Sequence, residues 1–168
     1  MRFLTKEESI KWCNNQGITL SSRSLPEMQK PDVEIVTFPF PNYLKFVALS
    51  KVLSKSALQG EECLLWVSDF SVWPSSENLP LYYKLRNSYT DFDLLIQRPG
   101  HLFAKHEIED LTNFLHLGLL FGWDCYLISD LDKTRVFISN DEMIDLCTID
   151  SECLQIIKSQ FITNAPAA

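Results

Sequence analysis

Short apolar runs rich in β-branched and aromatic residues alternate along this chain with segments whose apolar residues recur at helical spacing. Runs of the first kind are typical of buried strands, and the first of them ends at Pro39 and Pro41, which have no N–H to donate to a neighbouring strand. The pattern predicts strands over residues 33–40, 63–70, 92–97, 123–129 and 134–139, the third closed by a turn at residues 99–100.

Capping residues indicate where the helical segments begin and end. Thr5 and Glu8 have the spacing of a capping box, and Gly17 stands where a helix needs a left-handed stop. Asn42 and Asp150 are placed to cap later helices. Helices are therefore predicted over about residues 6–16, 43–56, 76–87, 108–121 and from 151 onward, and residues 139–142 form a second capping box.

The order of these elements predicts an α+β fold with a mixed sheet of about five strands covered by helices. Strands separated by helices favour parallel pairing, whereas the hairpin over residues 123–139 must be antiparallel and is followed by the last helix. At 168 residues the chain has room for one domain. We expect a single globular domain over residues 1–163 and a disordered tail over residues 164–168.

The charge is unevenly distributed along the chain. Residues 1–90 hold ten Lys and Arg against nine Asp and Glu, and residues 91–168 hold five against thirteen, so the net charge of −7 is made up of +1 in the first part and −8 in the second. Such a field repels phosphate, and we expect no nucleic-acid binding. It would attract a basic protein partner. A solvated acidic surface that only maintains solubility is the alternative.

The cysteines and the hydropathy indicate a cytoplasmic protein. The five cysteines are odd in number, lack a C-x-x-C pair and lie mostly in apolar runs, so we expect reduced thiols in a reducing compartment. The first residues lack the apolar region of a secretory signal. The longest uncharged stretch, residues 111–123, is too short to cross a bilayer, and we expect no membrane association.

Familiar catalytic and cofactor motifs are absent from the sequence. The five glycines form no phosphate-binding loop, and His101, His106 and His116 lack the spacing of metal ligands. No catalytic, metal or cofactor residue is therefore predicted. If the chain is instead a small enzyme with a site assembled from dispersed residues, the polar groups to test first are Arg86, His101, Asp124 and Cys125.

One stretch is rich in the residue types found at the energetic centres of protein interfaces. Tyr82, Arg86 and Tyr89 recur at i, i+4 and i+7 of the third predicted helix, and we expect this stripe to face solvent while Leu81 and Leu85 face the core. Ordinary amphipathic packing is the alternative. The predicted partner-binding residues are Trp73, Tyr82, Tyr83, Arg86 and Tyr89.

Three segments carry a resemblance. The run over residues 73–86, followed by Pro-Gly-His-Leu-Phe at 99–103 and Phe-Gly-Trp-Asp at 121–124, resembles uncharacterised bacterial proteins of similar size over roughly residues 62–140. The resemblance implies a bacterial origin and transfers no activity, cofactor or site residue. In gross character the chain is also similar to small acidic immunity proteins that neutralise toxins.

These observations together favour a non-enzymatic protein-binding domain with an inhibitor, immunity-like or adaptor role. The small enzyme described above is the alternative. A homodimer built through the stripe of residues 82, 86 and 89 is a third possibility.

Overall fold

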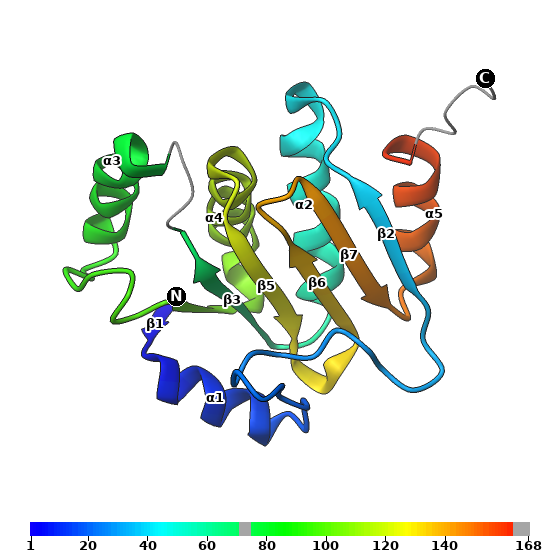
Figure 1. The fold of residues 1–168 in the computed structure, drawn as a ribbon, viewed down its shortest axis with the longest axis horizontal. Coiled ribbons are helices and arrows are strands. Elements are labelled where there is room, and N and C mark those ends of the chain that lie inside the picture. The colour runs from blue at the N-terminus through cyan, green and yellow to red at the C-terminus, as the bar shows by residue number, and fades with distance from the viewer. Residues whose placement is uncertain (71–74, 163–168) are drawn as a thin grey trace.

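A computed structural model describes residues 1–70 and 75–162, and the side chains of residues 75–78 are not described. The described residues form one seven-stranded sheet with the strand order β1-β4-β3-β5-β6-β7-β2, and all six neighbouring pairs in it are antiparallel (Figure 1). The strands are β1 (Arg2–Leu4), β2 (Ile35–Pro39), β3 (Glu62–Asp69), β4 (Gly100–Ala104), β5 (Asp124–Ser129), β6 (Thr134–Ile138) and β7 (Met143–Thr148).

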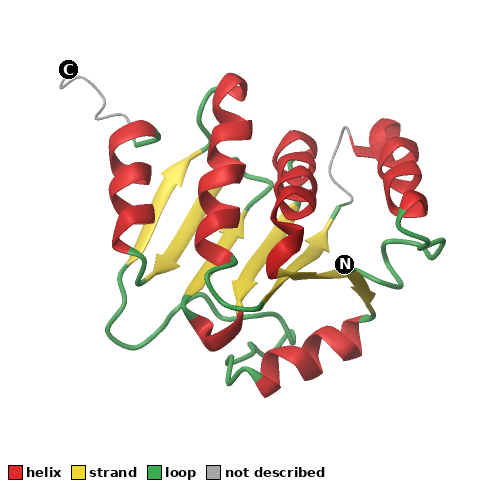
Figure 2. Cartoon of the chain, turned by 180° about the vertical axis from the view of Figure 1, so that it is seen from behind, coloured by secondary structure: helices red, strands yellow, loops and turns green. Residues whose placement is uncertain are grey.

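Helices cover the two faces of the sheet unequally. The described helices are α1 (Lys6–Asn15), α2 (Phe46–Ala57), α3 (Ser75–Ser88), α4 (Ile108–Phe121) and α5 (Ser151–Gln160). Figure 2 shows α2, α4 and α5 side by side in front of the strands, with α3 beyond α4 at one end. The main core lies under these helices, whereas α1 packs through Trp12 and Cys13 on the opposite face, against Leu64 and Ile128. An α+β fold is thereby confirmed.

The helix ends follow the predicted caps closely. Thr5 and Glu8 exchange the two hydrogen bonds of a capping box, and the side chain of Asp150 accepts the N–H of Cys153 at 3.1 Å. Asn42 accepts the N–H of Leu44 at 3.0 Å, where a short 3₁₀ turn (Tyr43–Lys45) leads into α2. The caps are local interactions, and the sequence therefore indicates them well.

The predicted strand count is too low, and one predicted strand is wrong. β1 and β7 were not predicted, and residues 139–142, interpreted as a helix start, instead turn the chain from β6 into β7. Residues 92–97 form an irregular loop, and the strand in that region begins at Gly100. In that segment only Leu95 is fully buried, so the alternating burial of a strand is absent.

The expectation of parallel pairing is also wrong. β4 and β5 are joined by α4 and run in the same direction, but β3 lies between them and is antiparallel to both. The same holds for β2 and β3, which α2 joins and which three strands separate. The connections through α2 and α4 thus give parallel directions without parallel neighbours, whereas the connection through α3 joins the antiparallel neighbours β3 and β4. The predicted tail at residues 164–168 lies outside the described residues.

Two groups of hydrogen bonds hold neighbouring elements of the fold together. The hydroxyl groups of Ser56, Thr134 and Thr148 form a chain with O–O distances of 3.0 and 2.7 Å, which ties α2 to β6 and β7. Asp130 accepts the N–H groups of Glu61 and Glu62 at 2.7 and 3.2 Å, which fixes the start of β3.

Candidate functional site

The predicted partner-binding stripe on α3 faces inward. Tyr82 is 1% exposed and Arg86 is 0% exposed, whereas Leu81, expected in the core, is 59% exposed. The prediction that the side chains of Tyr82 and Arg86 lie on the surface is therefore wrong. Tyr83 and Tyr89 are half-buried, and Trp73 lies outside the described residues.

The reason for this reversal is that the polar ends of the stripe find partners inside the protein. The hydroxyl of Tyr82 bonds to Nε2 of His101, and the hydroxyl of Tyr89 donates to Asp110. A buried polar group costs little when it is hydrogen-bonded. Helical periodicity identifies the stripe but not the side of the helix on which those partners lie.

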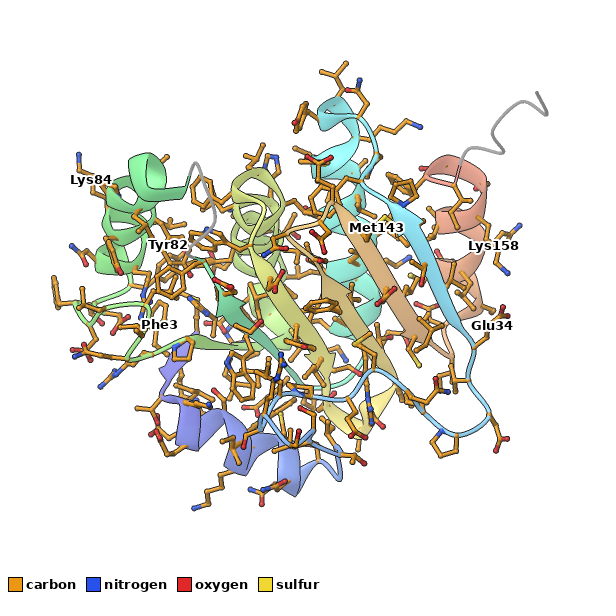
Figure 3. All side chains as sticks on the ribbon, viewed as in Figure 1. Phe3, Glu34, Tyr82, Lys84, Met143 and Lys158 are labelled. Carbon is orange, nitrogen blue, oxygen red and sulfur yellow. The ribbon has the colours of Figure 1, made fainter. Side chains whose placement is uncertain are left out.

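His101 is the centre of the buried aromatic cluster behind α3. Its Nδ1 lies 3.0 Å from the carbonyl oxygen of Pro99, which can only accept, so Nδ1 carries the proton and Nε2 accepts from Tyr82. Its ring contacts those of Phe3 and Tyr82, which Figure 3 labels, at centroid distances of 5.2 and 5.9 Å. Burial lowers the pKa of His101 to about 3, and the Arg86 guanidinium acts in the same direction.

Arg86 holds the loop that follows α3. Its Nε donates to Asp91 Oδ2 at 2.8 Å, and its guanidinium lies 4.7 Å from the centroid of the Phe3 ring. Arg98 lies 3.7 Å from the other oxygen of Asp91, and its Nε lies 2.8 Å from Asp93. Arg86 therefore attaches the start of residues 90–99 to α3, and Arg98 ties the end of this loop back to its start.

The same loop presents large apolar side chains to solvent. Phe92 is 77% exposed, Leu94 is 53% exposed and Ile96 is 71% exposed; these three residues are called the apolar loop surface below. Between them Leu95 is fully buried, and its N–H donates to the hydroxyl of Tyr83 at 3.1 Å. A further turn is closed by the N–H of Gln97 on the carbonyl of Leu94 at 2.9 Å.

Sequence reasoning missed this surface because its alternation of apolar and acidic residues is also that of a half-buried strand. The signal that distinguishes the two is the set of charges around it, Asp91, Asp93 and Arg98, which a buried strand would not tolerate unpaired.

The residues named for an enzymatic site fall into two separate places. Arg86 and His101 share the buried cluster behind α3, where protein groups bind both ring nitrogens of His101 and the Nε and Nη2 atoms of Arg86. Asp124 and Cys125 are neighbours on β5, where successive side chains point to opposite faces. Burial raises the pKa of the Cys125 thiol, and the Asp124 carboxylate adds to the effect. That thiol is thus held in its unreactive protonated form.

Three further features concern possible sites elsewhere in the protein. All five cysteines are free and buried, as predicted. Over the described residues, no group of three or more His, Cys, Asp or Glu side chains is arranged to hold a metal ion. A groove of about 480 Å³ lies between α2 and α4, and its lining residues are Lys51, Lys55, Ile108, Glu109, Thr112 and Asn113. None of the residues predicted for a site lines it.

Within the described part of the chain, no helix combines the length and the apolar character needed to cross a membrane. Comparison of the chain with protein-family models, with curated proteins and with solved structures finds no match in any of the three. The resemblance to bacterial proteins thus stays a prediction.

Proposed function

We propose that this protein is a non-enzymatic binding domain that inserts its apolar loop surface into an apolar cleft of a partner protein. The observation that carries the proposal is a loop that exposes Phe92, Leu94 and Ile96 together. The ion pair between Arg86 and Asp91 and the buried side chain of Leu95 anchor this loop to the rest of the protein. Inhibitor, immunity-like and adaptor roles in a bacterial cytoplasm would each use such a surface, and we propose a role of this kind.

Exposure of the apolar loop surface to water is unfavourable in the isolated chain. Burying one such side chain fully stabilises a protein by about 1.5–3 kcal/mol, and neighbouring exposed apolar residues mark interaction sites more often than single ones do. Ile96 and Phe92 lie within five residues of each other, on one short loop. A partner that covers them recovers this free energy.

The loop that carries this surface is already ordered before a partner binds. Leu95 fills the core beneath it, Tyr83 accepts the N–H of Leu95, and Arg86 and Arg98 pair with its carboxylates. Ordering a mobile loop costs free energy at the moment of binding, and a loop that is ordered beforehand avoids that cost. Tyr82, Tyr83, Arg86 and Tyr89 are then the support of the contact surface.

The experiment is affinity purification from the native host with three forms of the chain. We expect the parent chain to retain a stoichiometric partner and the Phe92→Ser/Ile96→Ser variant to lose it. Leu120→Ser/Ile149→Ser is the matched control, because Leu120 and Ile149 are 47% and 61% exposed on other parts of the surface. With the partner purified, titration calorimetry should show at least about a tenfold loss of affinity for the loop variant only.

Two outcomes would overturn the proposal. One is retention of the partner by the loop variant at parental affinity. The other is a parent chain that light scattering shows to be a dimer and that becomes monomeric on Phe92→Ser/Ile96→Ser, because a second copy would then occupy the surface. Both positions are exposed, so the free energy of unfolding should change by no more than about 0.5 kcal/mol, which urea titration checks.

A further inference from the structure

The sheet face opposite α2, α4 and α5 is only partly covered. Its lower part packs against α1 and the segment after it, through Leu64, Trp66 and Ile128. Figure 1 looks onto this face, and among the described elements none is drawn in front of the upper halves of β6 and β7. Thr37 and Met143 are exposed there, and Met143 is 36% exposed. Figure 3 labels Met143, which is the first residue of β7.

Strand register places a row of side chains across this uncovered part. Tyr126 pairs with Phe137, Phe137 with Asp145, and Asp145 with Thr37. The rings of Tyr126 and Phe137 lie tilted on each other at a centroid distance of 4.7 Å, and both are half-buried. The Thr37 hydroxyl donates to Asp145 Oδ1 at 2.6 Å, so the row combines a flat aromatic surface with an oriented carboxylate.

A second row above the first adds acidic groups. Asp124 and Met143 lie two residues before Tyr126 and Asp145 on their strands and therefore share their face. Asp124 Oδ1 accepts the N–H of Asn140 at 2.7 Å. Partial burial raises the pKa of Asp124, and the charges of Asp69 and Asp141 act in the same direction. The open sheet face is defined here as Thr37, Asp124, Tyr126, Phe137, Met143 and Asp145.

Two cations on this side of the sheet, Arg135 and Lys30, are already paired. Arg135 lies two residues before Phe137 on β6, but Asp132 binds its Nε and Nη2 at 2.6 and 2.7 Å. Its remaining nitrogen donates to the carbonyl oxygens of Glu27 and Gln29. Lys30 also lies against Asp132. The six residues of the open sheet face thus combine aromatic rings with carboxylates, and none of the six is basic.

We propose that the open sheet face binds an extended, arginine- or lysine-bearing segment of a partner protein. A guanidinium placed over the ring of Tyr126 or Phe137 is attracted by the negative face of the aromatic system. From there it can reach Asp124 or Asp145 for a charge-assisted hydrogen bond. The excess of acidic residues after residue 90 steers such a segment toward the protein.

This inference does not rest on the apolar loop surface, which lies beside α3. The carboxylates also distinguish the occupant from nucleic acid. Bases could stack on Tyr126 and Phe137, but their phosphates would meet Asp124 and Asp145.

The test uses ¹⁵N-labelled protein and a blocked octapeptide of alternating arginine and threonine. We expect amide shifts concentrated in β2, β5, β6 and β7, and no shifts with the same peptide carrying uncharged citrulline in place of arginine. Asp124→Asn/Asp145→Asn should weaken binding by about tenfold or more. The control Glu109→Gln/Glu152→Gln removes equal charge from exposed positions on α4 and α5, and it should change affinity by less than about threefold.

A third variant, Phe137→Leu, separates the aromatic contribution from that of charge and should weaken binding severalfold. Equal losses in the two double variants, or amide shifts scattered over α4 and α5, would show general attraction to an acidic protein and overturn the proposal. Tighter binding of an oligothymidylate at the same amides would assign the face to nucleic acid instead. Phe92→Ser/Ile96→Ser should leave peptide binding unchanged, so the two surfaces are tested separately.

Discussion

His101 is neutral in the folded chain because its two ring nitrogens have fixed and opposite roles. Nδ1 donates to a backbone carbonyl and Nε2 accepts from Tyr82, and the ring has no exposed surface. Protonation would place a second donor against the Tyr82 hydroxyl and a charge near Arg86. The folded state therefore resists a proton that the unfolded chain accepts readily.

This resistance predicts a pH-dependent stability. The unfolded chain binds a proton at His101 below about pH 6.5, whereas the folded chain binds it only near pH 3. Stability is therefore lost as the pH falls through this window, by about 1.4 kcal/mol per pH unit. Urea titrations at a series of pH values give the free energy of unfolding. Between these limits that free energy should fall more steeply with decreasing pH for the parent than for His101→Gln. Parallel slopes would show that His101 does not titrate in this way.

At this scale the sequence predicted which residues matter better than where they lie. Tyr82 and Arg86 were singled out because they recur at helical spacing, and they do lie together, with the Arg86 guanidinium 5.9 Å from the centroid of the Tyr82 ring. Their exposure could not be predicted, because His101 and Asp91 become their partners only when β4 and the loop pack behind α3. The surface that we propose for partner binding, at Phe92 and Ile96, has the sequence pattern of a strand.

Among the elements, those with local signals were predicted and those defined by pairing were not. The caps at Thr5 and Asp150 lie within a few residues of the groups they bind. By contrast, β1 is only three residues long and exists through its pairing with β4, about a hundred positions later. A strand of that length has too few residues for its alternation to be recognised.

The start of β3 offers a prediction about one such pairing-dependent element. A Cβ at position 60 would overlap the Asp130 carboxylate, which cannot move without losing the N–H groups of Glu61 and Glu62. Gly60→Ala should therefore destabilise the protein by about 2 kcal/mol in urea titration. Asp130→Ala should cost a similar amount.

The double variant Gly60→Ala/Asp130→Ala is the decisive measurement for this contact. Without the carboxylate there is nothing for the added methyl group to displace, so the double variant should be no less stable than Asp130→Ala alone. Two additive losses would show that the cost of alanine at position 60 has another origin.

For the whole molecule, the direction of a strand depends on its neighbours across the sheet. The helices α2 and α4 join strands that run in the same direction, as the sequence led us to expect, but another strand or several lie between them. By contrast, loop 90–99 brings the chain from α3 back to the end of β3, where Val67 donates to the carbonyl of Pro99, so β4 runs antiparallel to β3. Strand order is a long-range property and has no local signal.

The free edge at β2 gives a prediction at this scale. The N–H of Phe40 donates to Glu142 in the β7 direction, so the backbone nitrogen of Pro39 faces the open edge, where it has no hydrogen to donate. Pro39→Thr restores a donor beside those of Ile35 and Thr37. We expect its average mass in analytical ultracentrifugation to rise with concentration more steeply than that of the parent. Pro41→Thr, just beyond the strand, is the control, and identical behaviour of the two variants would contradict this role.

The pairing of β2 with β7 is also delayed while the chain is being synthesised. Thr37 and Asp145 are 108 positions apart, so β2 leaves the ribosome long before β7, its neighbour in the sheet of described strands, exists. At about 5–20 residues per second, that interval is roughly 5–20 seconds. During translation the strand remains without this neighbour, and the donor that Pro39 lacks leaves its edge one hydrogen bond poorer for pairing with another newly made chain.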